Sequence, residues 1–125
     1  MEPEKTTPMM HIGELAERTE LSLRTIRHYD EVGLLKPSGR TEGGFRLYTE
    51  SDFSRLMLIR RMKPLGFPLE EMSELLRIIT VLEQADDPSL RAELEGFIAR
   101  ATEQRQKLQK QLDMADEFLD LLRQR

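Results

Sequence analysis

The stretch that decides the fold is SLRTIRHYDEVGLL, residues 22–35. Ser22 is a good N-cap for a helix, and Gly33 is a typical helix stop. Between them, side chains with helical spacing form a candidate inward face made of Leu23 and Ile26 with Tyr29 or Asp30. The outward face would carry Arg24, Thr25, Arg27 and His28. The pattern therefore predicts a helix over residues 23–31 that presents basic and hydrogen-bonding side chains.

The segment before it, IGELAER at residues 12–18, predicts a shorter helix with Ile12, Leu15 and Ala16 on one face. The intervening TEL breaks the helical pattern. Two short helices joined by a tight turn predict a helix-turn-helix over residues 12–31. Residues 1–10 have no apolar periodicity of their own, so we expect a flexible tail there.

The segment after it, residues 36–48, is rich in turn residues and ends in FRLY, which alternates apolar and polar side chains as a short strand does. Leu34 and Leu35 are candidates to pair with that strand. The pattern predicts a small basic hairpin, or wing, over residues 36–48.

Two further helices are expected within residues 50–82. Thr49 is a candidate N-cap with Asp52 in the following turn, and Pro64 would end that helix. Pro68 suits the first position of the next helix. Residues 83–88 are polar and indicate a break, which closes a domain predicted over residues 11–82.

Residues 89–125 predict one long helix. Nine positions alternate spacings of four and three, and eight of them are apolar, which matches a coiled-coil seam. A small domain cannot cover such a seam, so a second copy of the chain is the expected partner. Arg105, the polar member, would pair with Asp113 or Glu103 of that copy. The seam consists of Leu94, Ile98, Ala101, Arg105, Leu108, Leu112, Ala115, Leu119 and Leu122.

Composition excludes several classes of protein. The 125 residues include no cysteine, which rules out disulfides, thiolate metal sites and a cysteine nucleophile. Two histidines alone make a poor metal site, and no phosphate-binding or nucleophile motif is present, so we expect neither a catalytic residue, a metal nor a cofactor. No apolar run is long enough for a membrane span, and no signal peptide is evident, which favours a cytoplasmic protein.

Charge is distributed unevenly. Nine basic and five acidic side chains lie between residues 22 and 63, so this segment carries +4 in a chain of net charge −4. A local basic patch, and not the total charge, is what binds phosphate. Arginine, threonine, histidine and tyrosine can all reach base edges or phosphates, and a dimer would place two such helices on one duplex.

Blander interpretations stay open for these residues. The arginines of residues 22–31 also suit a solvated helix with weak ion pairs. Tyr29 and Tyr48 also suit a half-buried core position with a wet hydroxyl. Arg60 and Arg61 are either plain surface or a second phosphate contact.

Taken in order, IGELA, SLRTIRHYDEVGLL, GGFRLYT and LGFPLEE across residues 11–76 resemble the MerR family of bacterial transcription regulators. The resemblance implies a winged helix-turn-helix dimer whose long helices form an antiparallel coiled coil. It assigns recognition-helix contacts to Arg24, Arg27 and Tyr29, and wing contacts to Arg40, Arg46, Tyr48 and Arg60. It also implies a promoter site that the dimer distorts so that RNA polymerase engages it.

The chain departs from the family's pattern in places. His28 stands where the family often has an aromatic residue, which would alter a backbone contact or add a pH dependence. His11 replaces the usual Ser or Thr cap. Nothing in the sequence suggests a ligand domain after the coiled coil, and the cysteines of the family's metal and redox sensors are missing. We therefore expect an effector between the coiled coil and the DNA-binding domain, or none.

The sequence thus predicts a mainly α protein, a winged helix-turn-helix DNA-binding domain followed by a dimerisation helix, that binds a pseudo-palindromic promoter site and is not an enzyme. Other classes remain: an excisionase-like DNA-architectural factor, a coiled-coil adaptor, or a regulator that senses an unknown small molecule in a pocket lined by Met72, Leu76, Ile79 and Phe97. The predicted DNA-binding residues are Ser22, Arg24, Thr25, Arg27, His28, Tyr29, Arg40, Arg46, Tyr48, Arg60 and Arg61.

Overall fold

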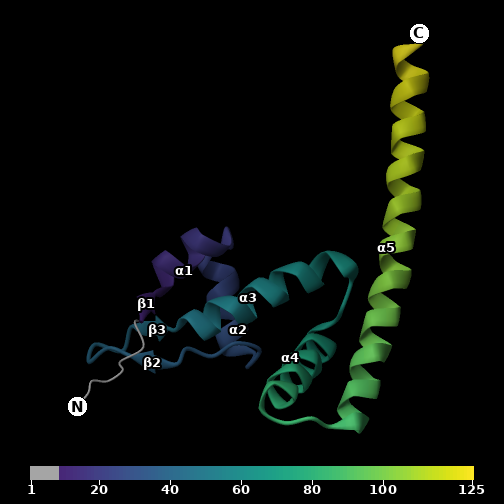
Figure 1. The fold of residues 1–125 in the computed structure, drawn as a ribbon. Helices are drawn as coiled ribbons and strands as arrows, with labels where there is room; N and C mark the ends of the chain where they lie inside the picture. Colours follow the sequence, from purple (N-terminus) through teal and green to yellow (C-terminus); the bar gives the residue numbers. More distant parts are fainter. Residues whose placement is uncertain (1–8) are drawn as a thin grey trace. The chain divides into compact units, whose positions relative to one another are not determined.

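The computed structural model describes residues 9–125, and it divides into two compact units that meet in sequence at Ser73 and Glu74. The first unit holds α1, α2 and α3, a short 3₁₀ helix, a small sheet and the start of α4; the second holds most of α4 and the whole of α5 (Figure 1). The predicted tail covers residues 1–10. Residues 1–8 lie outside the described residues, whereas Met9 and Met10 are described. Met10 is no tail residue, because it is buried and forms strand β1 (Met10–His11).

The helix-turn-helix is confirmed, with α1 at Ile12–Thr19 and α2 at Leu23–Glu31. Ser22 caps α2 as expected, since its hydroxyl accepts a hydrogen bond of 3.0 Å from the backbone N–H of Thr25. Glu20 makes the turn in the left-handed conformation at φ 60°, which is uncommon for a residue other than glycine. The cap and the turn together set the direction in which α2 leaves α1.

The inward face of α2 differs from the prediction at one position. Ile26, Tyr29 and Asp30 are buried, but Leu23 is exposed. Leu23 stands in the first turn, at the very start of the helix. Helical spacing assigns a residue to one face of a helix, but burial also requires that another element cover that face at the end of the helix.

The wing is a three-stranded antiparallel sheet in the order β1-β3-β2, with β2 at Gly39–Arg40 and β3 at Arg46–Tyr48. The expected pairing of Leu34 and Leu35 with β3 is wrong. Both are buried, and their backbone N–H groups donate to the carbonyl of Tyr29 at 2.9 and 3.1 Å, closing the end of α2. The two strands that pair with β3 are β1 and β2.

Helix α3 (Glu50–Met62) begins with the predicted cap. Thr49 accepts from the N–H of Asp52, and the Asp52 carboxylate accepts from the N–H of Thr49, which makes a reciprocal capping box. Leu56 and Ile59 are fully buried in the first unit. A short 3₁₀ helix, η1 (Lys63–Leu65), follows and ends at Gly66, whose φ of 83° suits glycine.

The second unit holds most of α4 (Leu69–Gln84) and α5 (Pro88–Arg123). Helix α4 begins at Leu69, one residue after the expected Pro68. The predicted polar break ends in a true N-cap, because the carboxylate of Asp87 accepts from the N–H groups of Ser89 and Leu90. With 36 residues, α5 is about 54 Å long at ~1.5 Å per residue.

Candidate nucleic-acid interface

The outward face of α2 carries the side chains that the sequence assigned to base reading. Arg24, Arg27 and His28 are all exposed. Among the residues that the structure describes, neither arginine has an ion-pair partner. The three side chains, with Glu31, border a shallow hollow on the helix surface. Both guanidinium groups therefore retain their donors for an external acceptor.

Ser22 and Thr25 stand at the start of this face but are partly committed to the cap. The Ser22 hydroxyl donates to the Thr25 hydroxyl at 2.9 Å while it accepts from the Thr25 N–H. Both hydroxyl groups remain at the N-terminal end of a helix, where backbone N–H groups favour a phosphate.

The two wing arginines converge on one carboxylate of α2. Arg46 Nε donates to Asp30 Oδ2 at 2.7 Å, and Arg40 Nη2 donates to the same oxygen at 3.3 Å. Lys36 Nζ lies 3.7 Å from the other oxygen. A buried acid thus joins the wing to the helix that carries Arg24 and Arg27.

This cluster is strongly ionic. The hydrogen bond from Arg46, with the charges of Arg46, Lys36 and Arg40, lowers the pKa of Asp30 in spite of its burial. The same bond raises the pKa of Arg46. Asp30 is therefore a carboxylate, and Arg46 a cation, at any physiological pH.

The tyrosines do not lie as the DNA-contact assignment requires. Tyr29 and Tyr48 are 3% and 0% exposed, and neither buried hydroxyl has a hydrogen-bond partner among the described residues. Burial also raises the pKa of Tyr48. Their rings belong to the core of the first unit because β3 and α2 turn them inward, so neither hydroxyl reaches the surface in this conformation.

Arg60 and Arg61, at the end of α3, differ in their surroundings. Arg60 Nη2 donates to the carboxylate of Glu20 at 2.9 Å, which links α3 to the turn before α2. Arg61 is exposed and has no ion pair with any residue from 9 to 125. An external phosphate would have to compete with Glu20 for Arg60, but not for Arg61.

The sequence analysis assigned no role on this surface to three residues, Phe45, Asp30 and Glu20. Phe45, at the tip of the wing, is 70% exposed, which is unusual for a phenylalanine. Asp30 and Glu20 hold the arginines that were assigned to phosphate. Only the exposure of Phe45 had a local signal, namely its place beside Gly43 and Gly44; the two acids contact partners 16 and 40 positions away.

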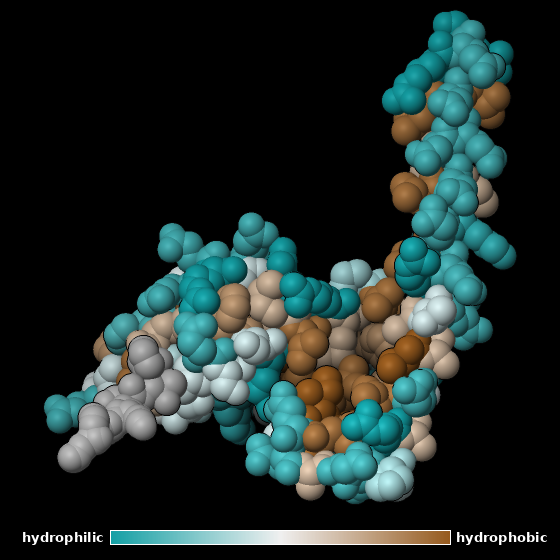
Figure 2. Space-filling model, viewed as in Figure 1, coloured by the Kyte–Doolittle hydropathy of each residue, from teal (hydrophilic) through white to brown (hydrophobic). Residues whose placement is uncertain are grey.

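The predicted dimer seam is an uncovered surface of α5. Figure 2 shows apolar side chains along the exposed part of this helix, set among polar ones. Leu112, in the middle of the seam, is 56% exposed, and Phe97 is the buried residue of the helix. The exposed large seam residues are Ile98, Leu108, Leu112, Leu119 and Leu122.

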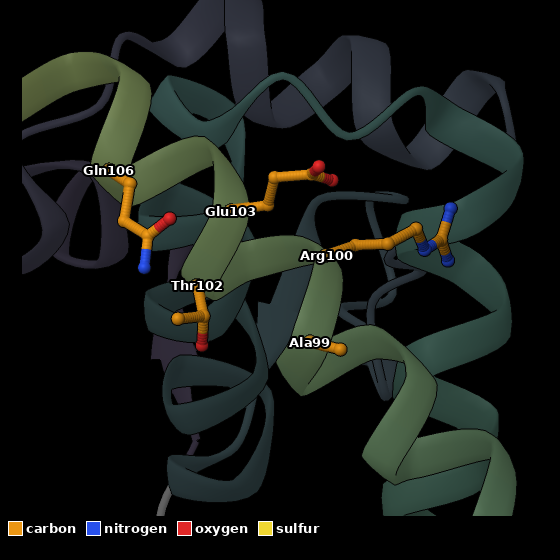
Figure 3. Close-up of a pocket in the computed structure, with 5 residues that line it drawn as sticks. All are labelled: Ala99, Arg100, Thr102, Glu103 and Gln106. Carbon is orange, nitrogen blue, oxygen red and sulfur yellow. The ribbon is translucent and has the colours of Figure 1, made fainter.

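One hollow lies on α5 itself and is bordered by Ala99, Arg100, Thr102, Glu103 and Gln106 (Figure 3). All five residues come from a single helix, so the hollow is a stretch of helix surface between side chains. The Arg100 guanidinium lies 4.6 Å from the ring of Phe97, which holds that side chain against the helix. This surface does not form the enclosed apolar cavity that a small-molecule effector needs.

Comparison with known protein families places the chain. The model of the MerR HTH family regulatory proteins matches residues 10–78, and that of the MerR DNA-binding region matches residues 53–124. The chain belongs to the MerR family of DNA-binding regulatory proteins. The first match spans α1, α2, the wing and α3, and the second runs from α3 to the end of α5.

Relatives extend the same picture. The HTH-type transcriptional regulator ZntR of Escherichia coli K12 is 53% identical over 70 residues, which is 56% of this chain and 50% of that protein. The chain spans about half the length of the curated relatives it matches first.

Solved structures resemble the chain over a longer stretch. MtaN, the N-terminus of the Bacillus subtilis multidrug transporter activator, is 32% identical with a TM-score of 0.58, over 90% of this chain and 93% of that one. HiNmlR, a MerR family regulator lacking the sensor domain and solved bound to promoter DNA, is 27% identical with a TM-score of 0.62, over 92% and 85%.

Two features are absent from residues 9–125. No group of three or more histidine or carboxylate side chains lies together as a metal site would require. No helix of this part of the chain has the length and apolarity needed to cross a bilayer.

Proposed function

We propose that this MerR-family chain acts in the cytoplasm as a homodimer that binds a pseudo-palindromic promoter site. The observation that carries the proposal is the pair of exposed arginines on α2, which have no ion-pair partner among the described residues. The wing, whose Arg40 and Arg46 bond to Asp30 of α2, lies beside this helix. Arg24 and Arg27 read base edges in the major groove. Arg40, Arg46, Arg60 and Arg61 add contacts to phosphate.

The dimer follows from α5. Its apolar seam has no cover within the second unit, and burying apolar surface is favourable. A second copy supplies the same seam, so two helices of this length cover each other in an antiparallel coiled coil. Two copies of α2 then read two half-sites related by a twofold axis.

Control of transcription proceeds through the shape of the DNA. The dimer bends and untwists its site, which changes how RNA polymerase engages the promoter elements on either side. HiNmlR, a MerR family regulator solved bound to promoter DNA, supports promoter binding by this chain. An unknown small-molecule effector would show itself as a ligand-dependent rise in melting temperature.

Selection of bound duplexes from a random-sequence pool, at near-physiological salt, tests the proposal. We expect an enriched dyad with two half-sites. An enriched single site without symmetry would contradict the proposed homodimer and favour a DNA-architectural factor. Enrichment of no sequence, with the protein folded and dimeric, would favour a coiled-coil adaptor.

A further inference from the structure

The acid at the centre of the candidate DNA-binding surface is unexpected, because a carboxylate near DNA repels phosphate. Asp30 lies on α2, two positions after His28, and its side chain is only 9% exposed. Its two oxygens are surrounded by Arg46, Arg40 and Lys36. The three cations outnumber the single acid, so the cluster keeps a net positive charge.

The contacts order both wing arginines and leave donor groups of Arg46 free. Arg46 uses Nε for Asp30, which leaves its two terminal amino groups for another acceptor. Arg40 is held twice, by Asp30 through Nη2 and by the carbonyl of Gly44 through Nη1 at 2.9 Å. A long side chain loses rotamer freedom when it binds a phosphate, and that cost is smaller when the side chain is already ordered.

We propose that Asp30 is a positioning residue for DNA binding, which fixes the wing arginines relative to α2 so that wing and recognition helix meet the duplex in one geometry. Asp30 touches no DNA itself and acts through Arg40 and Arg46. The inference rests on the proposed DNA-binding function and assigns a role to a residue which that proposal does not use.

Asp52 provides a matched control within the same unit. It is as buried as Asp30, with each residue 7% exposed. Its hydrogen bonds come from the hydroxyl of Ser38 at 2.6 Å and the N–H of Thr49 at 2.9 Å, and no arginine bonds to it in the described chain. Asp52→Asn therefore reports the cost of changing a buried, hydrogen-bonded carboxylate without loosening the wing arginines.

The decisive experiment compares Asp30→Asn in two backgrounds, the natural chain and an Arg40→Gln, Arg46→Gln double variant. Dissociation constants are measured by fluorescence anisotropy on the duplex recovered by selection, well below the melting temperature of every variant. We expect Asp30→Asn to weaken binding about tenfold in the natural chain and less than about twofold in the double variant. Asp52→Asn should lower the melting temperature with less than about a twofold change in affinity.

Other outcomes overturn the inference in distinguishable ways. Equal weakening in both backgrounds would mean that Asp30 has only a structural role. Tighter binding in the natural chain would mean that Asp30 merely repels phosphate. Failure of the unmodified protein to bind any duplex would overturn the proposed function as well, whereas the first two results leave it standing.

Arg46→Lys is the second variant, and it keeps the charge of the cluster. A lysine ammonium cannot bind Asp30 through one edge and a phosphate through another as a guanidinium does. We expect binding to weaken about fivefold although the net charge is unchanged. Unchanged affinity would overturn the positioning role even if Asp30→Asn failed to fold.

Discussion

The two units of the chain differ in how far contacts between their own elements cover their side chains. In the first unit, arginines find carboxylates on other elements: Arg46 with Asp30, Arg60 with Glu20, and Arg18 with Glu50. In α5, beyond residue 104, every residue is exposed. The first unit thus pairs several of its charges between its own elements, while the apolar seam of the long helix stays exposed. Disrupting each unit should accordingly have a different kind of effect.

The largest effect is expected on the seam. Leu112→Asp places a charge on the apolar surface twice per dimer, and we expect the dimer dissociation constant to rise roughly a thousandfold. Sedimentation equilibrium measures it. Gln106→Asp adds the same charge on another face of α5 and should leave the dimer intact; equal dissociation by both variants would contradict the seam.

Next comes base reading by α2. Arg24→Ala should weaken binding to the selected site by about 1–3 kcal/mol and relax preference at one base pair of each half-site. Binding to random duplex should fall much less. Competition assays with single-base variants of the site measure this, and an equal loss on every sequence would make Arg24 a phosphate contact.

A smaller and differently shaped effect is expected in the wing. Arg40→Ala should weaken binding to all sequences alike and reduce the slope of log affinity against log salt by roughly one unit. Titrations at several salt concentrations on selected and random duplexes test it. A loss confined to the selected site would refute the phosphate assignment.

Acid should weaken the first unit through Asp30. The lowered pKa of this carboxyl means that its ion pairs stabilise the fold above the unfolded pKa of about 4. That stability is lost as the pH falls through the folded pKa. The free energy of unfolding, measured by urea denaturation between neutral and acid pH, should fall less steeply in Asp30→Asn. Parallel profiles would show that Asp30 does not carry this pH dependence.

The smallest effect is expected at the exposed pair of Glu20 and Arg60. Glu20→Gln frees Arg60 for phosphate and should tighten DNA binding by about twofold, since exposed ion pairs contribute little. Anisotropy at low salt measures it. Weaker binding by this variant would instead show that Glu20 orients Arg60 as Asp30 orients the wing.

The sequence predicted several features that depend on neighbours along the chain. The starts of α2 and α3 follow from the caps at Ser22 and Thr49, because a cap and the helix that it opens lie a few positions apart. The inward turn of Tyr48 and the strand formed by Met10 depend on contacts with distant elements.

The same limit explains the candidate site. The type and order of Arg24, Arg27, Arg40 and Arg46 suggested DNA binding, but periodicity says nothing about which acid a cation meets. Asp30 looked like an ambiguous member of the inward face of α2. The fold brings the wing arginines to Asp30. The acid that interrupts the apolar pattern of α2 is therefore the centre of an ion cluster.

The uncovered seam of α5 also bears on gene dosage. When the active species is a pair of chains and the single chains predominate, the concentration of pairs rises with the square of the concentration of chains. Halving the supply of chains would then cut promoter occupancy about fourfold at low saturation. If the long helix must pair with its own copy, as proposed, the amount of protein becomes a steep input to transcription even without any effector.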